Sequence, residues 1–441
     1  YHVAGHYTHG KGYYEQEKLD ENLSDYNLEN IILTNDTIIS TDLIRRKWLD
    51  NDFGGLTYSL NHTTDNWNIF IGGGINHYSG QHYGNIIWAE YASNTDFDHQ
   101  YYWNKAEKKD NNIFAKINYK YSNNINLYLD LQKRNIKYTF EGIDENGNTA
   151  EQTVSSSFFN PKFGLFKTLD KNQSIYASFA VANKEPNRND YIESTPNSRP
   201  LHETLYDTEI GYHKKGKKID LGINLYYMKY KNQLALTGKI NDVGAYTRNN
   251  IDDSYRKGIE IEAKYNITPK TVINSNITIS ENKINNYTEY IDNWDSWVQE
   301  SVDYKNTDLA FSPNTIWSSI LSHKLTKNTD IDIISKYVGE QFIDNTSSEE
   351  RMLEAYLVNH LRISYNWNNR IFKKTRVTLQ INNILDNKYV SNAWVYRFIS
   401  EGWDPRDSDP YVNTDREGGY NMAGYFPEAT RNYMLDITLT F

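Results

Sequence analysis

In this 441-residue chain, the residues with reactive or binding side chains indicate ligand binding and not catalysis. The sequence holds no glycine-rich phosphate loop, no serine in a nucleophile-elbow context and no histidine pair with zinc-motif spacing. It also holds no cysteine, which excludes disulfides and thiolate ligands. The many Asp and Glu residues are explained more simply as a polar lining than as a catalytic pair. We therefore predict that the protein is not an enzyme and carries no metal and no cofactor.

Side chains suited to recognition concentrate in the segments between strand-like stretches. The aromatic ones are Trp88, Tyr91, Tyr101, Tyr102, Trp103, Trp294, Trp297, Trp394 and Trp403. The cationic ones are Arg188, Arg199, Arg248, Arg397 and Arg406. An aromatic face stacks on flat groups and attracts cations, and a guanidinium pairs with carboxylates. The simpler alternatives are rings that anchor one loop on another, and arginines in loop salt bridges.

An acidic cluster near the end of the chain is a weaker candidate. It consists of Asp404, Asp407, Asp409 and Asp415, next to two prolines. Oxygen-rich loops can bind calcium, but this stretch lacks the glycine-containing spacing of a calcium loop. We expect a solvated surface loop here.

The segments that must position these residues alternate apolar and polar side chains with period two. In the last segment, Tyr433, Leu435, Ile437 and Leu439 fall on the same face as Phe441. Similar alternation occurs in 113–121, 125–132, 175–181, 219–228, 259–267, 273–280, 361–365 and 377–382. This period predicts β-strands with one apolar face.

The connections between these segments alternate strictly between short and long. Short polar turns occur at Thr64–Asp65, Asn123–Asn124, Asp170–Asn172, Lys214–Gly216, Thr268–Lys270, Thr326–Asn328 and Asn368–Asn369. The long connections include Gly10–Thr41, Tyr78–Asp110, Lys184–His202, Glu281–Phe311 and Ser391–Ala429. Outer-membrane barrels have short periplasmic turns and long extracellular loops, whereas a soluble sandwich has no reason to sort its loops. We predict one all-β domain over residues 1–441, a transmembrane antiparallel β-barrel wall of about 16 strands.

Composition agrees with a barrel. The 37 Tyr and 10 Trp exceed what a core needs, and membrane–water interfaces are enriched in such residues. Candidates for an aromatic girdle near the short turns are Tyr119, Tyr121, Tyr265, Tyr365, Trp367 and Phe441. No stretch approaches the roughly 18 apolar residues of a membrane helix. The net charge of −10 argues against a nucleic-acid partner.

Several segments resemble TonB-dependent outer-membrane receptors, particularly the Bacteroidetes-type iron-complex and siderophore receptors. In chain order they are THGKGYYEQEK (8–18), ASFAVANKEPNRNDYI (177–192), HETLYDTEIGYHKKGKKIDLGINLYYMKYKNQL (202–234), QINNILDNKYVSNAWVYRF (380–398) and YFPEATRNYMLDITLTF (425–441). Segment 380–398 looks like the family's penultimate-strand motif, and 425–441 looks like its closing strand with a terminal aromatic residue. The resemblance spans essentially the whole chain.

This resemblance implies a receptor that imports an iron complex, either a siderophore or haem, or a similar scarce nutrient. The aromatic and arginine residues above would then be extracellular ligand contacts. His77, His82 and His99, in or beside one long connection, would be contacts for haem or cobalamin, whose metals take axial imidazole. His2 and His6 share one strand face and would line the lumen. The terminal Phe441 would be read by the barrel-assembly machinery.

The resemblance also implies partners. Family members carry an N-terminal plug that contacts TonB, and their barrels have about 22 strands. We expect this chain to be a C-terminal portion holding about the last 16 strands. Its expected partners are the plug and remaining strands of the same receptor, TonB, outer-membrane lipid and a surface lipoprotein.

Two alternatives from other classes stay open. A passive diffusion porin of about 16 strands would be complete as given, with its first strand paired to its last and an inward loop narrowing the pore. A scaffold or adhesion barrel would show no ligand-sized convergence of aromatic residues under its loops.

Overall fold

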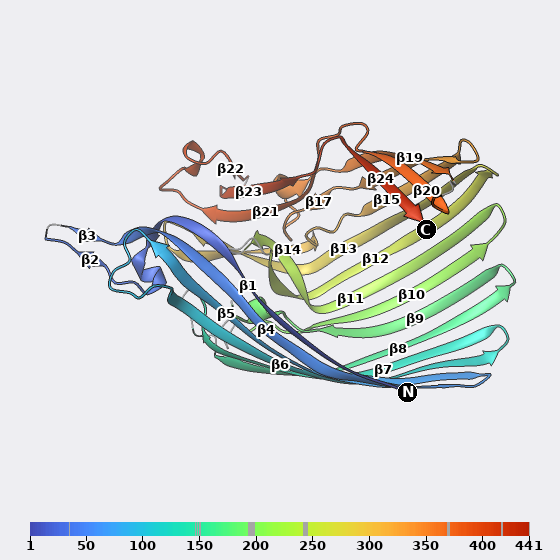
Figure 1. The fold of residues 1–441 in the computed structure, drawn as a ribbon, viewed down its shortest axis with the longest axis horizontal. Coiled ribbons are helices and arrows are strands. Elements are labelled where there is room, and N and C mark those ends of the chain that lie inside the picture. The colour runs from blue at the N-terminus through green and yellow to red at the C-terminus, as the bar shows by residue number, and fades with distance from the viewer. Residues whose placement is uncertain are drawn as a thin grey trace. The chain divides into compact units, whose positions relative to one another are not determined.

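The computed structural model describes the chain apart from residues 35, 146, 148, 150, 193–198, 241–245, 368–370, 416–417 and 441, and apart from the side chains of 240 and 246 (Figure 1). The predicted roles of Phe441 therefore fall outside the described residues, as does the predicted turn at Asn368–Asn369. No helix in the described part of the chain is long and apolar enough to cross a membrane.

Strands dominate the described chain, which confirms the predicted all-β fold. Sixteen strands run between the main connections: β1 (His2–Asn22), β4 (Ser40–Thr63), β5 (Trp67–Ala89), β6 (His99–Ser122), β7 (Ile125–Ile143), β8 (Gln152–Asp170), β9 (Gln173–Lys184), β10 (Glu203–Lys215), β11 (Ile219–Ile240), β12 (Tyr246–Thr268), β13 (Thr271–Asn293), β15 (Thr315–Lys324), β16 (Thr329–Val338), β19 (Tyr356–Trp367), β20 (Lys374–Asn382) and β24 (Asn432–Thr440).

The remaining elements lie within long connections. The strands are β2 (Ile31–Ile32), β3 (Thr37–Ile38), β14 (Val298–Asp308), β17 (Gln341–Phe342), β18 (Met352–Leu353), β21 (Val390–Ile399), β22 (Val412–Thr414) and β23 (Tyr420–Pro427). The helical turns are η1 (Leu23–Tyr26), α1 (Arg188–Ile192), η2 (Glu349–Arg351) and η3 (Pro405–Asp407). Twenty strands belong to a single sheet.

The short turns lie where the sequence predicts them. The connections are 64–66, 123–124, 171–172, 216–218, 269–270 and 325–328. Aromatic girdle candidates stand beside them: Trp67 stacks on Tyr119 with ring centres 4.1 Å apart, and Tyr121 and Tyr365 are 65% and 46% exposed.

The predicted long connections are partly wrong, because strands extend into them. β1 continues to Asn22 and β5 to Ala89, while β14, β21 and β23 form hairpins inside two other connections. Each extension finds a hydrogen-bonded neighbour, as β1 does along β4. Their side chains meet water or other loops on both faces, so the apolar–polar period that marks a wall strand is lost.

Residue contacts divide the chain into two compact units. Unit 1 comprises Tyr1–Lys120, Leu127–Lys162 and Glu185–Leu201; unit 2 comprises Tyr121–Asn126, Phe163–Lys184 and His202–Phe441. In unit 1, β1 pairs with β4, β4 with β5 and β5 with β6, all antiparallel. In unit 2, antiparallel pairing runs from β9 through β10, β11, β12 and β13 to β15, then through β16, β19 and β20 to β24.

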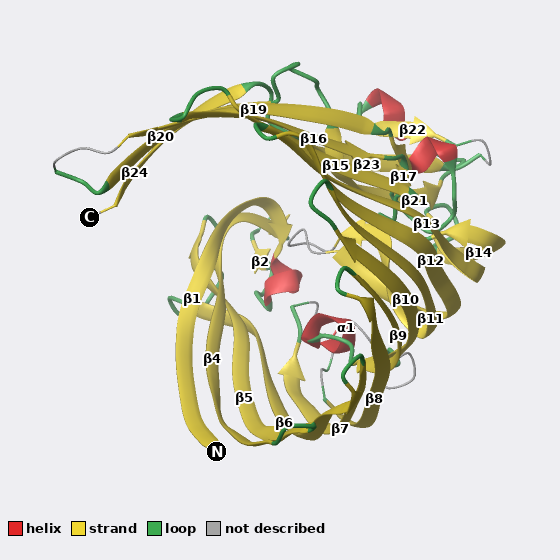
Figure 2. Cartoon of the chain, turned by 90° about the vertical axis from the view of Figure 1, so that its right-hand side faces the viewer, coloured by secondary structure: helices red, strands yellow, loops and turns green. Residues whose placement is uncertain are grey.

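The two faces of the unit 1 strands differ as the alternation predicts. One face, here called outward, carries Leu60, Ile71, Ile75 and Ile113, which are 54%, 42%, 55% and 52% exposed. Exposed apolar side chains in such number call for lipid. The opposite, inward face is overlaid by η1 and α1 (Figure 2).

Candidate ligand-binding site

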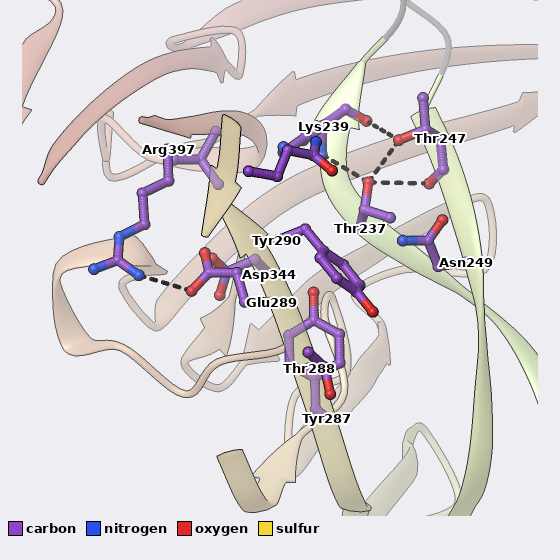
Figure 3. Close-up of a pocket in the computed structure, with 12 residues that line it drawn as sticks. Thr237, Lys239, Thr247, Asn249, Tyr287, Thr288, Glu289, Tyr290, Asp344 and Arg397 are labelled. Carbon is purple, nitrogen blue, oxygen red and sulfur yellow. Dashed lines mark hydrogen bonds and ion pairs between the residues drawn. The ribbon is translucent and has the colours of Figure 1, made fainter. Parts of the chain in front are cut away.

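A cavity of about 270 Å³ lies among the long connections of unit 2 (Figure 3). Its walls come from β11, β12, β13, β14, β21 and the connection 339–355. The lining residues are Thr237, Lys239, Thr247, Asn249, Tyr287, Thr288, Glu289, Tyr290, Gln299, Asp344, Val395 and Arg397. Hydroxyl, amide, aromatic and charged groups therefore converge on one space, which suits a polar ligand oriented by several hydrogen bonds.

Two buried arginines and three carboxylates form an ionic network at the wall of this cavity. Arg397, 4% exposed, donates from Nη1 to Glu289 Oε2 at 2.8 Å and from Nε to Asp415 Oδ2 at 2.5 Å. Arg351, 3% exposed, places Nε 2.7 Å from Asp344 Oδ2 and Nη1 3.8 Å from Asp415 Oδ2. Charges removed from water need partners, so these contacts fix four separate segments of unit 2 to one another.

Lys239 places an ammonium group at the wall of the cavity. Its Nζ lies 5.1 Å from the ring centre of Tyr396, and it makes no ion pair with a described residue. The neighbouring carboxylate of Asp292 already accepts hydrogen bonds from Tyr396 Oη at 2.7 Å and from Gln299 Nε2 at 2.8 Å. An unpaired ammonium beside a preformed cavity offers an anchor to an anionic ligand.

An aromatic stack adjoins the cation–π pair. Trp294 stacks on Phe398 at 4.0 Å and on Trp403 at 5.8 Å, with interplanar angles of 15° and 12°. Trp294 Nε1 also donates to Tyr396 Oη at 3.2 Å. Phe398 is fully buried, whereas Trp403 is 50% exposed. The stack therefore ends in the half-exposed indole of Trp403, which a ligand could contact.

The structure brings several predicted contacts of unit 2 together. Arg397 is on the cavity wall, and Trp294 and Trp403 form the stack. Trp394 of β21 packs its indole against Gly424 of β23, so closely that a Cβ added at Gly424 would collide with the ring. Trp297 is 87% exposed in the turn between β13 and β14.

Arg248 does not join the cavity. It stands between Thr247 and Asn249 on β12, and both neighbours line the cavity. Successive side chains of a strand point to opposite faces, so Arg248 points away.

In unit 1 the connection that follows β9 folds over the inward face; we call residues 185–192 the strap. Glu185 accepts from Lys108 Nζ at 2.5 Å and from Arg134 Nη1 at 2.9 Å. Arg134 also donates to Asp110 at 2.5 Å. Next to these charges, Tyr191 is buried in an apolar cluster with β6 and β7. Two ion pairs and one aromatic ring thus hold the strap to the wall.

Two of the predicted arginine contacts anchor this region instead of standing free. Arg188 donates from Nη1 to Gly80 O at 3.1 Å and from Nη2 to Asn104 Oδ1 at 2.6 Å. Burial lowers the pKa of Arg188. Arg199 donates from Nε to Gln152 Oε1 at 3.1 Å. Both guanidiniums bind neutral acceptors, so each fastens a connection to the wall strands.

The histidines are distributed differently from the prediction. His77 and His82 lie in β5 and not in a loop, and their odd spacing puts them on opposite faces. His99 begins β6, where its Nε2 lies 2.9 Å from Tyr26 O. The three imidazoles therefore do not converge. The error arose because the extension of β5 lacks a regular apolar period.

His2 and His6 both belong to β1 and share a face, as expected from their spacing. The ring of His6 lies 5.0 Å from that of Phe53 on β4.

The aromatic candidates of unit 1 divide by burial. Tyr101 and Tyr102 are 3% and 8% exposed within a core that includes Leu23 and Tyr26 of η1, so they hold that connection in place. Trp88, Tyr91 and Trp103 make no part of this core: Trp88 and Tyr91 are 51% and 37% exposed, and Trp103 Nε1 donates to Gln81 Oε1 at 3.0 Å.

Two members of the acidic cluster of unit 2, Asp404 and Asp415, are paired with arginines. Arg406 donates from its side chain and its backbone N–H to Asp404, which lowers the pKa of Asp404 to about 2. Asp415 belongs to the ionic network through Arg397. In the described part of the chain, no group of three or more His, Asp or Glu residues is placed to hold a metal ion.

The strap should loosen in acid. Burial acts to raise the pKa of Glu185, but the hydrogen bond and charge of Lys108 and the charge of Arg134 outweigh it, so the pKa lies below the ordinary value of 4.5. A depressed carboxyl pKa stabilises the fold above the ordinary pKa, and this contribution is lost as the pH falls through the depressed value. Hydrogen exchange of residues 185–192 should therefore speed up between pH 6 and pH 3, relative to β5.

The matched control is Glu185→Gln, whose strap should exchange faster at pH 6 and show no further acid-induced step. An equal acid step in this variant would show that Glu185 does not fasten the strap.

Sequence reasoning missed most of the cavity. Nothing in the sequence around Lys239, Thr237 and Thr247 indicates a binding site. These residues line the cavity only because the folded chain brings their strands next to β13 and β21. Tyr287 and Tyr290 could have been flagged, since both fall within the long connection predicted over Glu281–Phe311.

Comparison with known proteins agrees with this architecture. A family model described as "TonB dependent receptor-like, beta-barrel" matches residues 3–384. No curated protein matches the chain.

Solved structures with a similar fold include the ferric-catecholate import receptor Fiu of E. coli K12 in its closed form, with 14% identity and a TM-score of 0.59 over 99% of this chain and 60% of Fiu. The copper transporter OprC has 12% identity and a TM-score of 0.67, over 99% of this chain and 62% of OprC. The ferric yersiniabactin uptake receptor FyuA of Yersinia pestis has 10% identity and a TM-score of 0.57, over 91% of this chain and 57% of FyuA. At such identities the likeness concerns the fold, and the chain spans between 57% and 62% of these proteins' lengths.

Proposed function

Because this chain belongs to the TonB-dependent receptor β-barrel family, a family of outer-membrane transport receptors and not of enzymes, we propose that it forms the wall and capture loops of an importer for an iron complex. A siderophore, haem or a similar scarce nutrient is captured by the extracellular connections. Energy for uptake comes from TonB acting through a plug. On the segments quoted above, we assign the chain to the Bacteroidetes-type receptors.

The observation that supports this proposal is that a cation and an exposed indole lie near one cavity. Lys239 makes no ion pair with a described residue, and Trp403 ends an ordered stack that Tyr396 links to Lys239. A ferric siderophore complex combines negative charge with flat aromatic or chelate surfaces, which match an ammonium and an indole face. The cavity, about 270 Å³, has room for one limb of such a ligand.

A siderophore is favoured over haem by the histidines. His77 and His82 are on opposite faces of β5, and His99 is engaged with a backbone carbonyl. Capture of an anionic chelate needs no axial imidazole.

We predict that Lys239→Gln in the full-length receptor weakens binding of a ferric siderophore by roughly 10- to 100-fold, since a charged hydrogen bond contributes about 1.5–3 kcal/mol. Tryptophan fluorescence titration with ferric catecholate, hydroxamate and carboxylate complexes measures the change. Lys231→Gln on the same strand is the control, because Lys231 lies outside the cavity. Equal affinities of the two variants for every complex would overturn the assignment.

A passive porin remains the alternative, since the strap is an inward loop such as a porin would have. The two differ in energy dependence: uptake by the receptor stops when the proton motive force is dissipated or TonB is deleted, whereas diffusion through a porin continues.

A further inference from the structure

The charged side chains that line the unit 2 cavity balance one another. Two are cations and two are carboxylates: Lys239, Arg397, Glu289 and Asp344. Glu289 accepts a hydrogen bond from Arg397 at 2.8 Å. Asp344 Oδ2 lies 2.7 Å from Nε of Arg351, behind the lining. The cavity therefore offers a ligand no large excess of positive charge.

Lys239 supplies the charge that is left for a ligand. It makes no ion pair with a described residue, and its Nζ lies 5.1 Å from the ring centre of Tyr396. The hydroxyl of Tyr396 donates to Asp292 at 2.7 Å, and the opposite charges of Asp292 and Lys239 attract at longer range. One ammonium group with a carboxylate in its vicinity suits one negative charge and not several.

A strongly anionic ligand would meet repulsion in this cavity. The carboxylates of Glu289 and Asp344 line the same space as Lys239. Like charges placed together at an interface oppose binding and exclude the wrong partner. A ferric tris-catecholate carries three negative charges, and ferric polycarboxylates carry several, so both bring more charge than one ammonium group can match.

Neutral hydrogen-bonding groups make up much of the remaining lining. Figure 3 shows Thr237, Thr247 and Asn249 together on one side of the ring of Tyr290. The two threonine hydroxyls lie 2.6 Å apart. The amide of Asn249 and the hydroxyl of Tyr290 make no hydrogen bond with a described residue. An amide and a phenol can each donate and accept, so they suit the neutral carbonyl and N–H groups of a ligand.

Ferric hydroxamates present this combination of groups. Three hydroxamates neutralise the charge of ferric iron, and the chain that joins them carries neutral amide groups. One carboxylate at the end of such a chain would match Lys239. The volume of about 270 Å³ suits the end of a chain and not a whole complex.

We propose that the imported complex is a ferric hydroxamate with at most one negative charge, whose carboxylate-bearing end enters the cavity and pairs with Lys239. This inference rests on the proposed function and narrows its ligand class. Asn249 and Tyr290 bind the neutral part of the chain end. Glu289 and Asp344 act as the element that rejects polyanionic complexes.

The test titrates the full-length receptor in detergent with a series of ferric complexes, followed by tryptophan fluorescence. Ferrioxamine B, its N-acetyl form and its N-succinyl form share one trihydroxamate chelate, and their chain ends are cationic, neutral and anionic. The N-succinyl form should bind roughly 10-fold more tightly than the N-acetyl form, through one charge-assisted hydrogen bond to Lys239. Ferric enterobactin, a tris-catecholate, and ferric citrate should bind at least about 10-fold more weakly than the N-succinyl form.

Two variants separate the charged contact from the neutral ones. Lys239→Gln should bring the N-acetyl and N-succinyl forms within about two-fold of each other, because only the anionic end uses the ammonium group. Asn249→Ala should weaken both forms by about five-fold, the effect of one neutral hydrogen bond. Lys231→Gln, outside the cavity, is the matched control and should keep the preference for the N-succinyl form.

The possible failures are distinguishable. Tighter binding of ferric enterobactin or ferric citrate than of every ferrioxamine, or equal binding of the N-acetyl and N-succinyl forms, would overturn this inference and leave the receptor an importer of iron complexes. If none of the five complexes binds, the proposed function fails together with it. The ligand series is measured on the wild-type receptor, so its outcome decides even if a variant does not fold.

Discussion

Replacing Arg397 with methionine should destabilise the packed connections of unit 2 by about 3–5 kcal/mol, the usual cost of removing one partner from a buried ionic network. Arg397 is 4% exposed and supplies partners to Glu289 and Asp415. Methionine fills a similar volume, so the loss comes from two buried carboxylates that no longer receive hydrogen bonds from their nearer cation. Arg351 reaches the same carboxylates only at 4.0 and 3.8 Å, too far to replace the lost hydrogen bonds.

Hydrogen exchange of the membrane-embedded receptor measures this effect. Residues 286–304 and 390–427 should exchange faster in Arg397→Met, whereas β11 near its short turn should not change. Arg406→Met is the control: its pair with Asp404 is exposed at 50% and 41%, and such pairs contribute about 0–1 kcal/mol. If hydrogen exchange in Arg397→Met is no faster than in the Arg406→Met control, the ionic network does not hold these connections together.

Arg134→Met should release the strap of unit 1. Arg134 pairs with Asp110 and Glu185, whose side chains are only 18% and 14% exposed. Loss of the guanidinium leaves two partly buried carboxylates, with Lys108 able to serve only Glu185, and we expect a cost of about 2–4 kcal/mol. The apolar contact of Tyr191 alone offsets little of this. Limited trypsin digestion should then cut after Arg188, which the wild-type strap protects.

Arg362→Met provides the comparison. Arg362 makes a similar pair with Asp332, which is 10% exposed, but both residues belong to wall strands and touch no strap. Its digestion pattern should match wild type at Arg188. Protection of Arg188 in Arg134→Met would mean that Tyr191 and Arg188 suffice to hold the strap.

The wall of the protein was predictable because its signal is local. A strand with lipid on one side must alternate side chains within a few residues, as 259–267 does, and a two-residue turn such as Asn123–Asn124 needs only its own polar residues. The strand count of about 16 and the turn positions followed from these two patterns.

The connections were less predictable. β14, β21 and β23 were expected as loop, because a strand whose two faces contact other loops need not alternate. His82 shows the consequence: it falls within the predicted long connection Tyr78–Asp110, but it is a residue of β5. The alternative that rings anchor loops holds for Tyr101 and Tyr102, which are buried.

The sequence by itself determined the wall, its outward and inward faces, the short turns and the absence of a recognisable catalytic motif, since each depends on near neighbours in the chain. Only the tertiary structure decided which arginine has a partner. Arg397 and Arg351 share three carboxylates drawn from β13 and two connections, whereas Lys239 makes no ion pair with a described residue. Pairing over such separations depends on how strands are placed side by side, and no local pattern records it.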